Sequence, residues 1–574
     1  MVRFKAAATT DRQRYMTFRS NANPMFRSSF SETIFKQKYA HENAETWTDL
    51  CRTLVEDVCG DDMCKTDKDQ LTNYMQDMKF IPGGRYIYYA GRTAKFFNNC
   101  YLLRAEEDTR EDWANLSWKA ESCLMTGGGI GVDYSVYRPV GQPLSRTGGL
   151  SSGTIPKMNM INEIGRRVMQ GGSRRSAIYA SLNWKHGDIQ EFLAAKDWEK
   201  LPVGTTGVSY WDVKQQDFNF PAPLDMTNIS VNYDTKWLLN YWQTGDVGEV
   251  FKQNVEQALR TAEPGFSFNF FDKENETLRN ACTEVTSEDD SDVCNLGSLN
   301  LGRIDSVPEL RSVVQLATMF LLCGTKRAHL PYDKVYDVRE KNRRLGLGLM
   351  GVHEWLIKRG DIYEVTPELH RWLSIYKGVS DETAIKFATR LSVNRPVAVR
   401  AIAPTGTIGI LAGTSTGIEP IFAVAYKRRY LKGTKWHYQM VVDSAAQELI
   451  DLYGANPDKI ESALDLAADY ERRIKFQADI QDYVDQSISS TINLPSWGSK
   501  LNNPDTVSGF ADTLARYAHR LRGFTCYPDG SRGGQPLTAV PYATAREALG
   551  EEFEEAVQTH DICDITGHGG SCGV

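Results

Sequence analysis

Three side chains in the segment Arg279-Asn280-Ala281-Cys282-Thr283-Glu284 carry groups that can do chemistry together. If the segment is a strand, its side chains alternate between two faces, so Asn280, Cys282 and Glu284 point the same way. An amide can hold a substrate hydroxyl, and a carboxylate can accept its proton. A thiol between them can be a nucleophile or, as a thiyl radical, can abstract a hydrogen atom. The spacing alone is equally consistent with a polar row on an exposed strand.

Two further cysteines stand in distinctive surroundings. Cys294 opens the run Cys294-Asn295-Leu296-Gly297-Ser298-Leu299-Asn300-Leu301, and Cys100 closes Asn98-Asn99-Cys100. The acidic segment at 287–292 is expected to be a solvated loop, after which Cys294 begins the next strand or helix and returns to the same pocket. Taken by itself, Cys294 is equally well explained as a buried cysteine without a chemical role.

Two segments of small residues indicate close contacts of the backbone. Pro404-Thr405-Gly406-Thr407-Ile408-Gly409 follows an apolar strand expected at 397–403, and N–H groups and hydroxyls at a strand end can bind a phosphate. Without further context, an ordinary turn is the simpler interpretation. The run Thr126-Gly127-Gly128-Gly129-Ile130-Gly131 fits neither the dinucleotide fingerprint nor the P-loop, and it indicates a tight approach of another backbone segment.

Together these motifs resemble the catalytic chain of a ribonucleotide reductase, from about residue 81 to about residue 537. The resemblance rests on the cysteines, an Asn-x-Cys-x-Glu core and Pro-Thr-Gly-Thr in the family's order. The family's usual core, Asn-Pro-Cys-Gly-Glu, here reads Asn-Ala-Cys-Thr-Glu, which keeps the functional residues. The resemblance implies the family's ten-stranded α/β barrel and its reaction, the thiyl-radical reduction of ribonucleotides to 2′-deoxyribonucleotides for DNA synthesis.

The resemblance gives each barrel residue a role. Cys282 would carry the thiyl radical that abstracts the 3′ hydrogen of the substrate. Glu284 would take the 3′-hydroxyl proton, and Asn280 would hold the sugar. Cys100 and Cys294 would deliver protons and electrons to the 2′ position and close to a disulfide.

The resemblance also implies contacts for the substrate phosphates and for the reductant. The phosphates would lie against Thr405, Gly406 and Thr407, and Gly417-Ile418-Glu419-Pro420 also looks like a family pattern. Cys563 and Cys572 lie in a Gly-rich tail, where a thiol pair can reduce the barrel disulfide by exchange and be restored by thioredoxin or a similar donor. The usual family pair is closer together, and two unrelated exposed thiols would give the same pattern.

An allosteric site is implied as well. The family passes the identity of a bound effector, a deoxynucleotide or ATP, to the substrate base through a Gly-rich basic loop, which here comprises Gly171, Gly172, Ser173, Arg174 and Arg175. Asp108 stands where the family has an acidic effector contact, and the loop at about 138–149 would help to hold the effector. The family's effector site usually lies at a dimer interface, which implies a homodimer. As a bare pattern, the basic loop is a solvated turn.

The radical must originate outside the side chains, because none generates one unaided. Family members with a radical-generating partner subunit carry two adjacent tyrosines before an Arg-Asp-Gly run, but Phe524-Thr525-Cys526-Tyr527-Pro528-Asp529-Gly530-Ser531-Arg532 has one. This stretch, with the short spacing from Cys282 to Cys294, resembles the adenosylcobalamin-dependent branch. The adjacent pair Tyr88-Tyr89 precedes Cys100, where the family has phosphate contacts. We therefore expect adenosylcobalamin, with a separate radical-generating small subunit as the alternative.

Composition sets broad limits on the class of protein. Of 574 residues, 41% are hydrophobic and 24% charged, as in ordinary soluble globular proteins. The formal net charge of -7 argues against non-specific binding to nucleic acid. No signal peptide or membrane span is expected, and the most apolar stretch, at about 313–323, is interpreted as a buried helix. The scattered cysteines favour a reducing cytoplasm, and no metal site is expected.

Three regions must position the candidate residues. Residues 1–84 are expected to be mostly helical, with an amphipathic helix at 45–58 in place of a separate ATP-binding domain. Residues 85–540 alternate short apolar runs with helical segments, the pattern of an α/β architecture. Residues 541–574 are expected to be a flexible tail that contains an acidic helix at about 547–555 and the redox cysteine pair.

Two other classes of protein fit part of this pattern. A catalytically silent nucleotide-binding relative that regulates a partner would not need all the barrel residues named above. A thiol–disulfide oxidoreductase would have no use for a phosphate-binding turn, and the chain lacks a Cys-x-x-Cys pair. Turnover of a ribonucleotide separates these classes.

Overall fold

An N-terminal helical layer precedes the main sheet in the computed structural model, which describes residues 26–27, 29–168, 176–217, 220–432, 435–531, 537–549 and 552–556. The layer contains α2 (Ser29–Lys38), α3 (Trp47–Cys59) and α4 (Lys65–Gln76). In α3, the Thr46 side chain caps the first turn by accepting from the backbone N–H of Asp49, and the buried residues recur at helical spacing. The predicted amphipathic helix is thereby confirmed.

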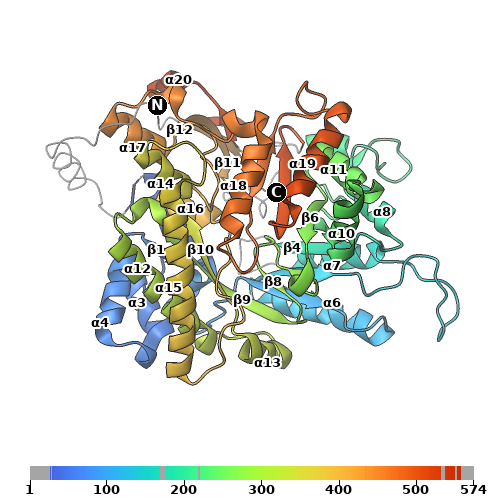
Figure 1. Cartoon of the computed structure of the whole chain (residues 1–574), viewed down its shortest axis with the longest axis horizontal. Helices are drawn as coiled ribbons and strands as arrows, with labels where there is room; N and C mark the ends of the chain where they lie inside the picture. Colours follow the sequence, from blue (N-terminus) through green and yellow to red (C-terminus); the bar gives the residue numbers. More distant parts are fainter. Residues whose placement is uncertain are drawn as a thin grey trace.

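Ten strands form the main sheet, which closes into a ring of two halves (Figure 1). The first half consists of parallel strands: β2 (Cys100–Arg104), β3 (Gly129–Asp133), β4 (Ile178–Asn183), β5 (Thr227–Tyr233) and β6 (Gly265–Phe268). The second half pairs β9 (Asp292–Asn300) with β10 (Leu345–Met350) and β13 (Thr491–Leu494) with β14 (Gly523–Pro528), again in parallel. The short strand β1 (Phe80–Pro82) pairs antiparallel with residues 297–299 of β9, while residues 292–294 of β9 pair with β2.

Three junctions close the ring. The halves meet in antiparallel fashion where β2 pairs with β9 and where β6 pairs with β14. Between β10 and β13, residues 400 and 402 make parallel bridges to Leu347 and Ile488. The ring therefore has five strands in each half when the 400–402 segment replaces β1 in the count. This arrangement confirms the predicted ten-stranded α/β barrel.

Helices cover the outside of the ring (Figure 1). Strands buried on both faces explain the continuous apolar runs in the sequence. The helices are α5 (Gly84–Tyr89), α6 (Arg110–Met125), α7 (Ile155–Arg167), α8 (Ile189–Ala194), α9 (Tyr210–Gln216), α10 (Thr235–Thr244), α11 (Glu249–Thr261), α12 (Val307–Arg327), α13 (Asp333–Asn342), α14 (Val352–Arg359), α15 (Pro367–Leu391), α16 (Gly406–Ala412), α17 (Ser444–Tyr453), α18 (Tyr470–Gln481), α19 (Val507–Ala518) and α20 (Tyr542–Glu547). In Figure 1, α6, α7, α8, α10 and α11 lie on the right and α12, α14 and α15 on the left, while α19 lies beside α11.

Helix α12 contains the most apolar stretch of the chain. By length and composition alone it could cross a membrane, but 67% of its apolar window is buried inside the protein. It packs against α3 and α15 on one side and against β9 and β10 on the other. The prediction of a buried helix is confirmed.

A second sheet, absent from the sequence-based expectation, lies beside the barrel. It consists of β15 (Leu537–Ala539), β11 (Ala425–Lys432), β12 (Lys435–Val442) and β16 (Glu552–Ala556), paired antiparallel in that order. The prediction of an acidic helix at 547–555 is wrong, because α20 ends at Glu547 and residues 552–556 form the strand β16. The edge of β12 that does not pair with β11 has backbone N–H and C=O groups available for hydrogen bonding. The acidic segment 552–556 pairs with these groups as β16.

A small hairpin stands inside the ring and carries the central motif. Its strands, β7 (Leu278–Arg279) and β8 (Thr286–Ser287), pair antiparallel, and we call residues 276–288 the finger loop. The loop contacts β2 and β3 on one side, while its Glu284 carbonyl accepts from the Ser487 N–H on the other. A Cβ at Gly131 would lie 1.7 Å from the carbonyl oxygen of Arg279, so only glycine fits there. The close approach predicted from the glycine run is confirmed.

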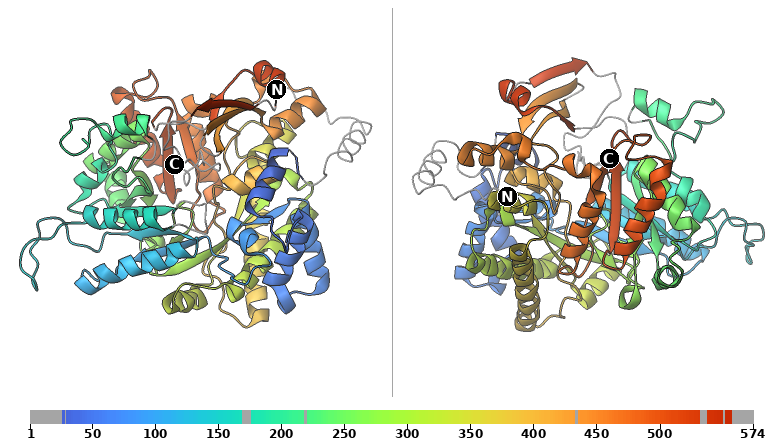
Figure 2. Two further views of the ribbon diagram at one scale, coloured as in Figure 1. Left: turned by 180° about the vertical axis from the view of Figure 1, so that it is seen from behind. Right: turned by 45° about the horizontal axis from the view of Figure 1, so that its top comes forward.

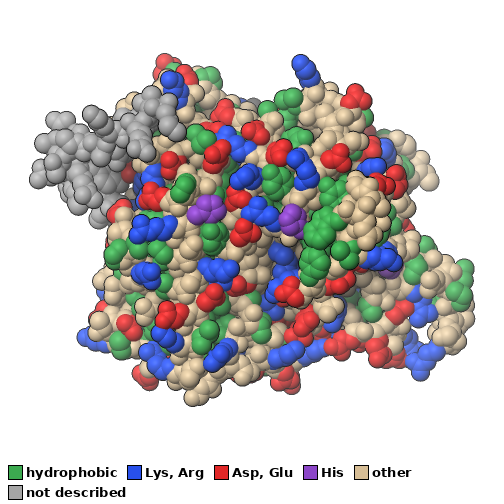
Figure 3. All heavy atoms as spheres, in the orientation of Figure 1, with side chains coloured by type: hydrophobic (Ala, Val, Ile, Leu, Met, Phe, Trp, Pro, Cys, Tyr) green, Lys and Arg blue, Asp and Glu red, His purple; other side chains and the backbone are tan. Residues whose placement is uncertain are grey.

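Charged side chains of both signs lie next to one another over the face seen in Figure 3. No stripe of a single sign crosses this face. The distribution agrees with the balanced composition of 66 basic and 73 acidic residues.

Candidate active site

Cys282 lies at the tip of the finger loop (Figure 2 gives two further views of the ring). The strands of the hairpin end at Arg279 and resume at Thr286, and Thr283 adopts a left-handed backbone with φ of 70°. The interpretation of 279–284 as a continuous strand is therefore wrong. A turn gathers the same side chains by a different route: the Asn280 side chain hydrogen-bonds the Glu284 carboxylate, and its Oδ1 accepts from the Val285 N–H at 2.9 Å.

Cys100 and Cys294 face each other across the junction of the two half-barrels. They are directly opposite in the antiparallel pairing of β2 with β9, and both side chains are buried. Opposite residues in such a ladder have Cα atoms about 4.5–5.5 Å apart, within the range of roughly 4.4–6.8 Å over which disulfides form. The Asn280 Nδ2 donates to the Cys100 Sγ at 3.1 Å, which connects this pair to the tip.

The Cys294 thiol lies in an environment that keeps it protonated. Burial raises its pKa well above the ordinary value, and the nearby Asp292, Glu284 and Cys100 act in the same direction. Arg344 opposes them only in part. A thiol that holds its proton at neutral pH can deliver both a proton and an electron.

Glu284 is a buried carboxyl with a vacant acceptor. Within the described part of the chain, its Oε2 has no hydrogen-bond partner. Burial raises its pKa to about 7, and hydrogen bonds from the Asn280 side chain and from its own backbone only partly offset this. A group with this pKa exchanges protons readily at neutral pH, and the vacant oxygen is available to a substrate hydroxyl.

The root of the finger loop is held by a cluster that the sequence analysis missed. Arg279 is fully buried and donates to the Asn269 Oδ1 at 2.6 Å and to the Arg522 carbonyl at 3.2 Å. Glu276 accepts from the Thr286 hydroxyl at 2.7 Å and from the Arg522 Nη2 at 2.9 Å. We call Glu276, Arg279, Thr286 and Arg522 the root cluster.

Arg522 acts on the two other charged groups of the root cluster, Glu276 and Arg279. Burial would raise the pKa of Glu276, but Arg522, the Thr286 hydroxyl and other cations lower it to about 2. Burial and the neighbouring Arg522 lower the pKa of Arg279 to about 9. No local sequence pattern marks these residues, because Arg522 reaches the loop only through the β6–β14 junction. The ion pair between Glu276 and Arg522 could be predicted only from the pairing of β6 with β14.

The acidic segment at 287–292 is mostly buried, with only Glu288 exposed and Asp289 half-buried, so its prediction as a solvated loop is wrong. Asp290 forms ion pairs with Lys119 and Lys334, each at 2.8 Å, and Asp292 pairs with Arg344 at 2.9 Å. Both aspartates are almost fully buried. These cations come from other elements, and they make the burial of a carboxylate tolerable.

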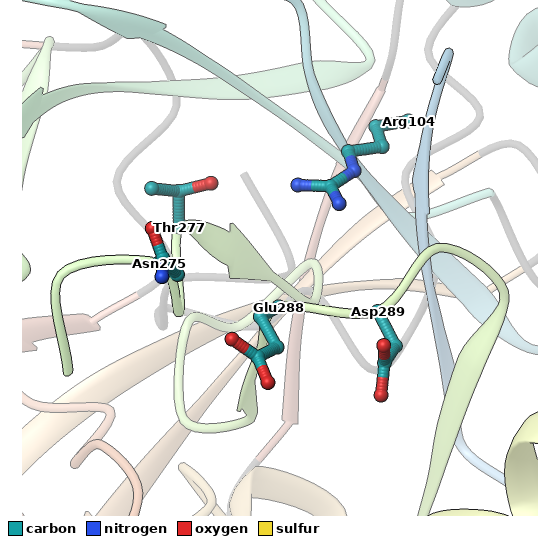
Figure 4. Close-up of a pocket in the computed structure, with 5 residues that line it drawn as sticks. All are labelled: Arg104, Asn275, Thr277, Glu288 and Asp289. Carbon is teal, nitrogen blue, oxygen red and sulfur yellow. The ribbon is translucent and has the colours of Figure 1, made fainter. Parts of the chain in front are cut away.

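A cavity of about 330 Å³ lies at the root of the finger loop (Figure 4), lined by Arg104, Asn275, Thr277, Glu288 and Asp289. The Arg104 side chain reaches toward Thr277, whereas the carboxylates of Glu288 and Asp289 point away from it. Arg104 ends β2 and Cys100 begins it, so the cavity lies at the far end of the ring from Cys100. We give it no part in the chemistry at the tip.

The predicted phosphate turn lies at the end of the ring where β2 begins. It follows the 400–402 segment, which runs parallel to β10 and therefore antiparallel to β2. Thr405 has a left-handed backbone and its hydroxyl accepts from the Gly417 N–H at 2.7 Å, while Gly406 and Thr407 begin α16. The two patterns noted in the sequence, at 404–409 and 417–420, are thus in direct contact.

The residues expected at the effector site are only partly described. Asp108 accepts from the Nε of Arg138 at 2.5 Å, at the base of a loop that projects from the body of the molecule (Figure 2). The basic loop, Gly171 to Arg175, lies outside the described residues, and so do Cys563 and Cys572 of the tail.

The tyrosines considered for a radical relay lie on two different elements: Tyr527 is on β14, and the adjacent pair Tyr88 and Tyr89 is on α5. Tyr527 lies opposite Asn493 near the end of that strand and is followed by Pro528. The Tyr88 and Tyr89 rings are 5.0 Å apart at the end of α5, where the Tyr89 hydroxyl donates to the Thr126 carbonyl at 3.2 Å.

Comparison with known proteins identifies the family. Residues 98–216, 232–371 and 394–527 match the sequence model of the ribonucleotide reductase barrel domain, so the chain belongs to the ribonucleotide reductase family. It is 25% identical, over 96% of this chain and 81% of the relative, to a vitamin B12-dependent ribonucleoside-diphosphate reductase of Mycobacterium tuberculosis. It is 26% identical, over 85% and 68%, to a protein of the same description from Thermoplasma acidophilum.

A solved structure has the same fold. The Actinobacillus ureae class Id ribonucleotide reductase alpha subunit superposes with a TM-score of 0.67 over 88% of this chain and 97% of that chain, at 17% sequence identity. The family, the barrel and the enzyme class predicted from the sequence are confirmed.

Proposed function

We propose that the tip of the finger loop reduces ribonucleotides to 2′-deoxyribonucleotides through a thiyl radical on Cys282. The observation that carries this proposal is the continuous set of contacts at the tip. Asn280 touches both Glu284 and Cys100, and Cys294 lies directly opposite Cys100. A silent regulatory relative would have no need of this arrangement.

The residues divide the reaction between them. Cys282 abstracts the 3′ hydrogen, Glu284 takes the 3′-hydroxyl proton through its vacant oxygen, and Asn280 holds the sugar. The 2′ hydroxyl then leaves as water with protons and two electrons from Cys100 and Cys294, which close to a disulfide. The hydrogen returns from Cys282 to the 3′ carbon.

Thr405, Gly406 and Thr407 are proposed to bind the substrate phosphates. They lie at the same end of the ring as Cys100, and the contact of Thr405 with Gly417 fixes the turn. Both Mycobacterium and Thermoplasma relatives are named ribonucleoside-diphosphate reductases, which supports a diphosphate as the substrate.

Adenosylcobalamin is proposed as the radical source. When bound, it supplies the organic radical that oxidises a thiol. Cys282 is half-buried at the tip, whereas Glu284 and Cys294 are fully buried. Tyr527 is the one tyrosine on β14, so the described chain offers no adjacent pair on that strand for a relay from a partner subunit.

The remaining partners follow from the same proposal. Thioredoxin or a similar donor would restore the barrel thiols through Cys563 and Cys572, in a reducing cytoplasm. Effector deoxynucleotides or ATP would bind near Asp108, with Gly171, Gly172, Ser173, Arg174 and Arg175 passing their identity to the substrate base. Large apolar side chains exposed on α6, α7 and the loop between β3 and α7 support a homodimer there: Trp118, Met125, Leu150 and Met160.

Turnover by the isolated chain tests the proposal. Anaerobic assays in the dark, with a ribonucleoside diphosphate, a dithiol and adenosylcobalamin, should yield the deoxynucleotide. Product that forms only when a metal-containing subunit is added would contradict the proposal of adenosylcobalamin as the radical source. The proposal that the chain reduces ribonucleotides would still stand. Absence of product under both conditions would contradict the function itself.

A further inference from the structure

Two residues near the N-terminus, Arg27 and Ser31, hydrogen-bond the carboxyl end of α16. The Arg27 Nη1 donates to the Gly413 carbonyl at 2.9 Å, and the Ser31 hydroxyl donates to the Ile410 carbonyl at 2.6 Å. Both acceptors lie at the carboxyl end of the helix, where the Ile410 carbonyl also accepts from the Gly413 N–H at 3.1 Å. Arg27 and Ser31, which lie 386 and 379 positions from these acceptors in the sequence, therefore add hydrogen bonds at this end of α16.

The Arg27 guanidinium is held in a network of buried charges. It forms ion pairs with Glu354 at 2.7 Å and Glu448 at 3.1 Å. The Glu354 carboxylate is fully buried and also pairs with Lys358 at 2.8 Å. Burial would raise the pKa of Glu354, but Arg27 and Lys358 hold it well below its ordinary value. Arg27 is thus a fixed cation at the carboxyl end of α16, the favourable end for a positive charge.

The position of α16 depends on such contacts because the helix is short. Its seven residues span roughly 10 Å, and a helix of this length is not stable alone. Gly413 ends it with a left-handed backbone, and a Cβ there would lie 2.9 Å from the Cβ of Arg27. A shift of the Arg27 contact would therefore move the whole helix and, with it, the turn at 405–407.

We propose that Arg27, assisted by Ser31, is a positioning residue for the nucleotide phosphates. Its contacts at one end of α16 fix the place of Thr405, Gly406 and Thr407 at the other. The inference rests on the proposed phosphate role of that turn, and it adds the N-terminal segment to the parts of the chain that determine substrate affinity. Arg27 would act on the turn through α16, by its contacts with Gly413, Glu354 and Glu448.

The test is Arg27→Ala in the full chain, with Arg520→Ala as the matched control. Arg520 also bridges two carboxylates, Asp479 at 2.9 Å and Asp482 at 2.6 Å, away from α16. In Arg27→Ala we expect KM for the ribonucleotide to rise about tenfold, equivalent to roughly 1.4 kcal/mol, with kcat within about twofold of the wild type. Arg27→Lys should recover part of the loss because it keeps a cation beside Glu354.

Two further measurements separate this proposal from the proposed function. Equilibrium dialysis should show weaker binding of the nucleotide to Arg27→Ala but unchanged binding of the nucleoside, which lacks phosphate. Amide hydrogen exchange at 407–412 should be faster in Arg27→Ala and unaltered in Arg520→Ala. Unchanged nucleotide affinity or unchanged exchange in α16 would overturn the proposal, even in a chain that reduces no substrate.

Discussion

The tip and the root of the finger loop lie a few residues apart and respond to burial in opposite ways. At the tip, burial raises the pKa of Glu284 to about 7, and no cation among the described residues lowers it. At the root, burial has the same tendency, but Arg522 and Thr286 lower the pKa of Glu276 to about 2. The sign of a buried carboxyl's pKa shift is thus set by the partners that the fold brings to it.

This difference separates two tasks. The root cluster is permanently charged and joins the hairpin to the β6–β14 junction, which fixes the direction of the loop. The tip has a carboxyl, Glu284, whose pKa of about 7 lets it change protonation at neutral pH, and its Oε2 has no hydrogen-bond partner among the described residues. Positioning at the root and chemistry at the tip can therefore be perturbed separately.

The largest effect is expected at the tip, from Cys282→Ser. A hydroxyl is a much poorer hydrogen-atom carrier than a thiol, so deoxynucleotide formation should be abolished. Nucleotide binding and the thermal unfolding temperature should remain near those of the wild type. Appreciable product from this variant would remove Cys282 from the role of radical carrier.

Glu284→Gln should lower kcat by about 10²–10⁴, the usual contribution of a general base. In the wild type, Glu284 accepts a proton only when ionised, so kcat should rise as pH increases through about 7. This rising limb should vanish in the variant. Measurement of kcat from pH 5.5 to 8.5 decides the matter, and a limb that persists in Glu284→Gln would assign it to another group.

A smaller effect is expected from Glu276→Gln at the root. The substitution keeps an acceptor for Thr286 but removes the charge opposite Arg522, which should lower the free energy of unfolding by about 1–3 kcal/mol and kcat by roughly tenfold. Because its folded pKa of about 2 lies below the ordinary 4.5, the wild-type Glu276 stabilises the protein above pH 4.5, and this is lost as pH falls toward 2. Denaturant unfolding of both proteins at pH 3 and pH 7 measures the difference. Equal losses at the two pH values would contradict the charge pairing.

The smallest effect is expected at the cavity beside the root. Glu288 is exposed, and Glu288→Ala should change stability by less than about 0.5 kcal/mol. Turnover should stay within about twofold, because the cavity lies at the opposite end of β2 from Cys100. A large loss of activity would show that the cavity takes part in the reaction.

Sequence patterns predicted those elements whose signal is local. The spacing of apolar residues located α3, and the long apolar run located α12 as a buried helix. The candidate site residues were predicted from the resemblance to a family. That prediction does not depend on the predicted backbone conformation of each motif being right. The segment 279–284 was expected as a strand, yet its turn still brings Asn280 to Glu284 and Cys100.

The remaining features depend on contacts between distant parts of the chain. Asp290 and Asp292 look solvated in the sequence and are buried only because Lys119, Lys334 and Arg344 reach them. The strand β16 forms because β12 has an open edge, a fact that no local pattern of charges can express. The root cluster likewise requires the closure of the ring.

A single-turnover experiment tests the central claim most directly. Prereduced enzyme, with cobalamin and a ribonucleoside diphosphate but no external reductant, is quenched, alkylated and mapped by mass spectrometry. The account predicts a disulfide between Cys100 and Cys294 that accumulates in step with the deoxynucleotide in a chain whose Cys563 and Cys572 are replaced by serine. Deoxynucleotide formed while Cys100 and Cys294 both remain alkylatable would contradict the assignment of the tip and its facing thiols as the reducing centre.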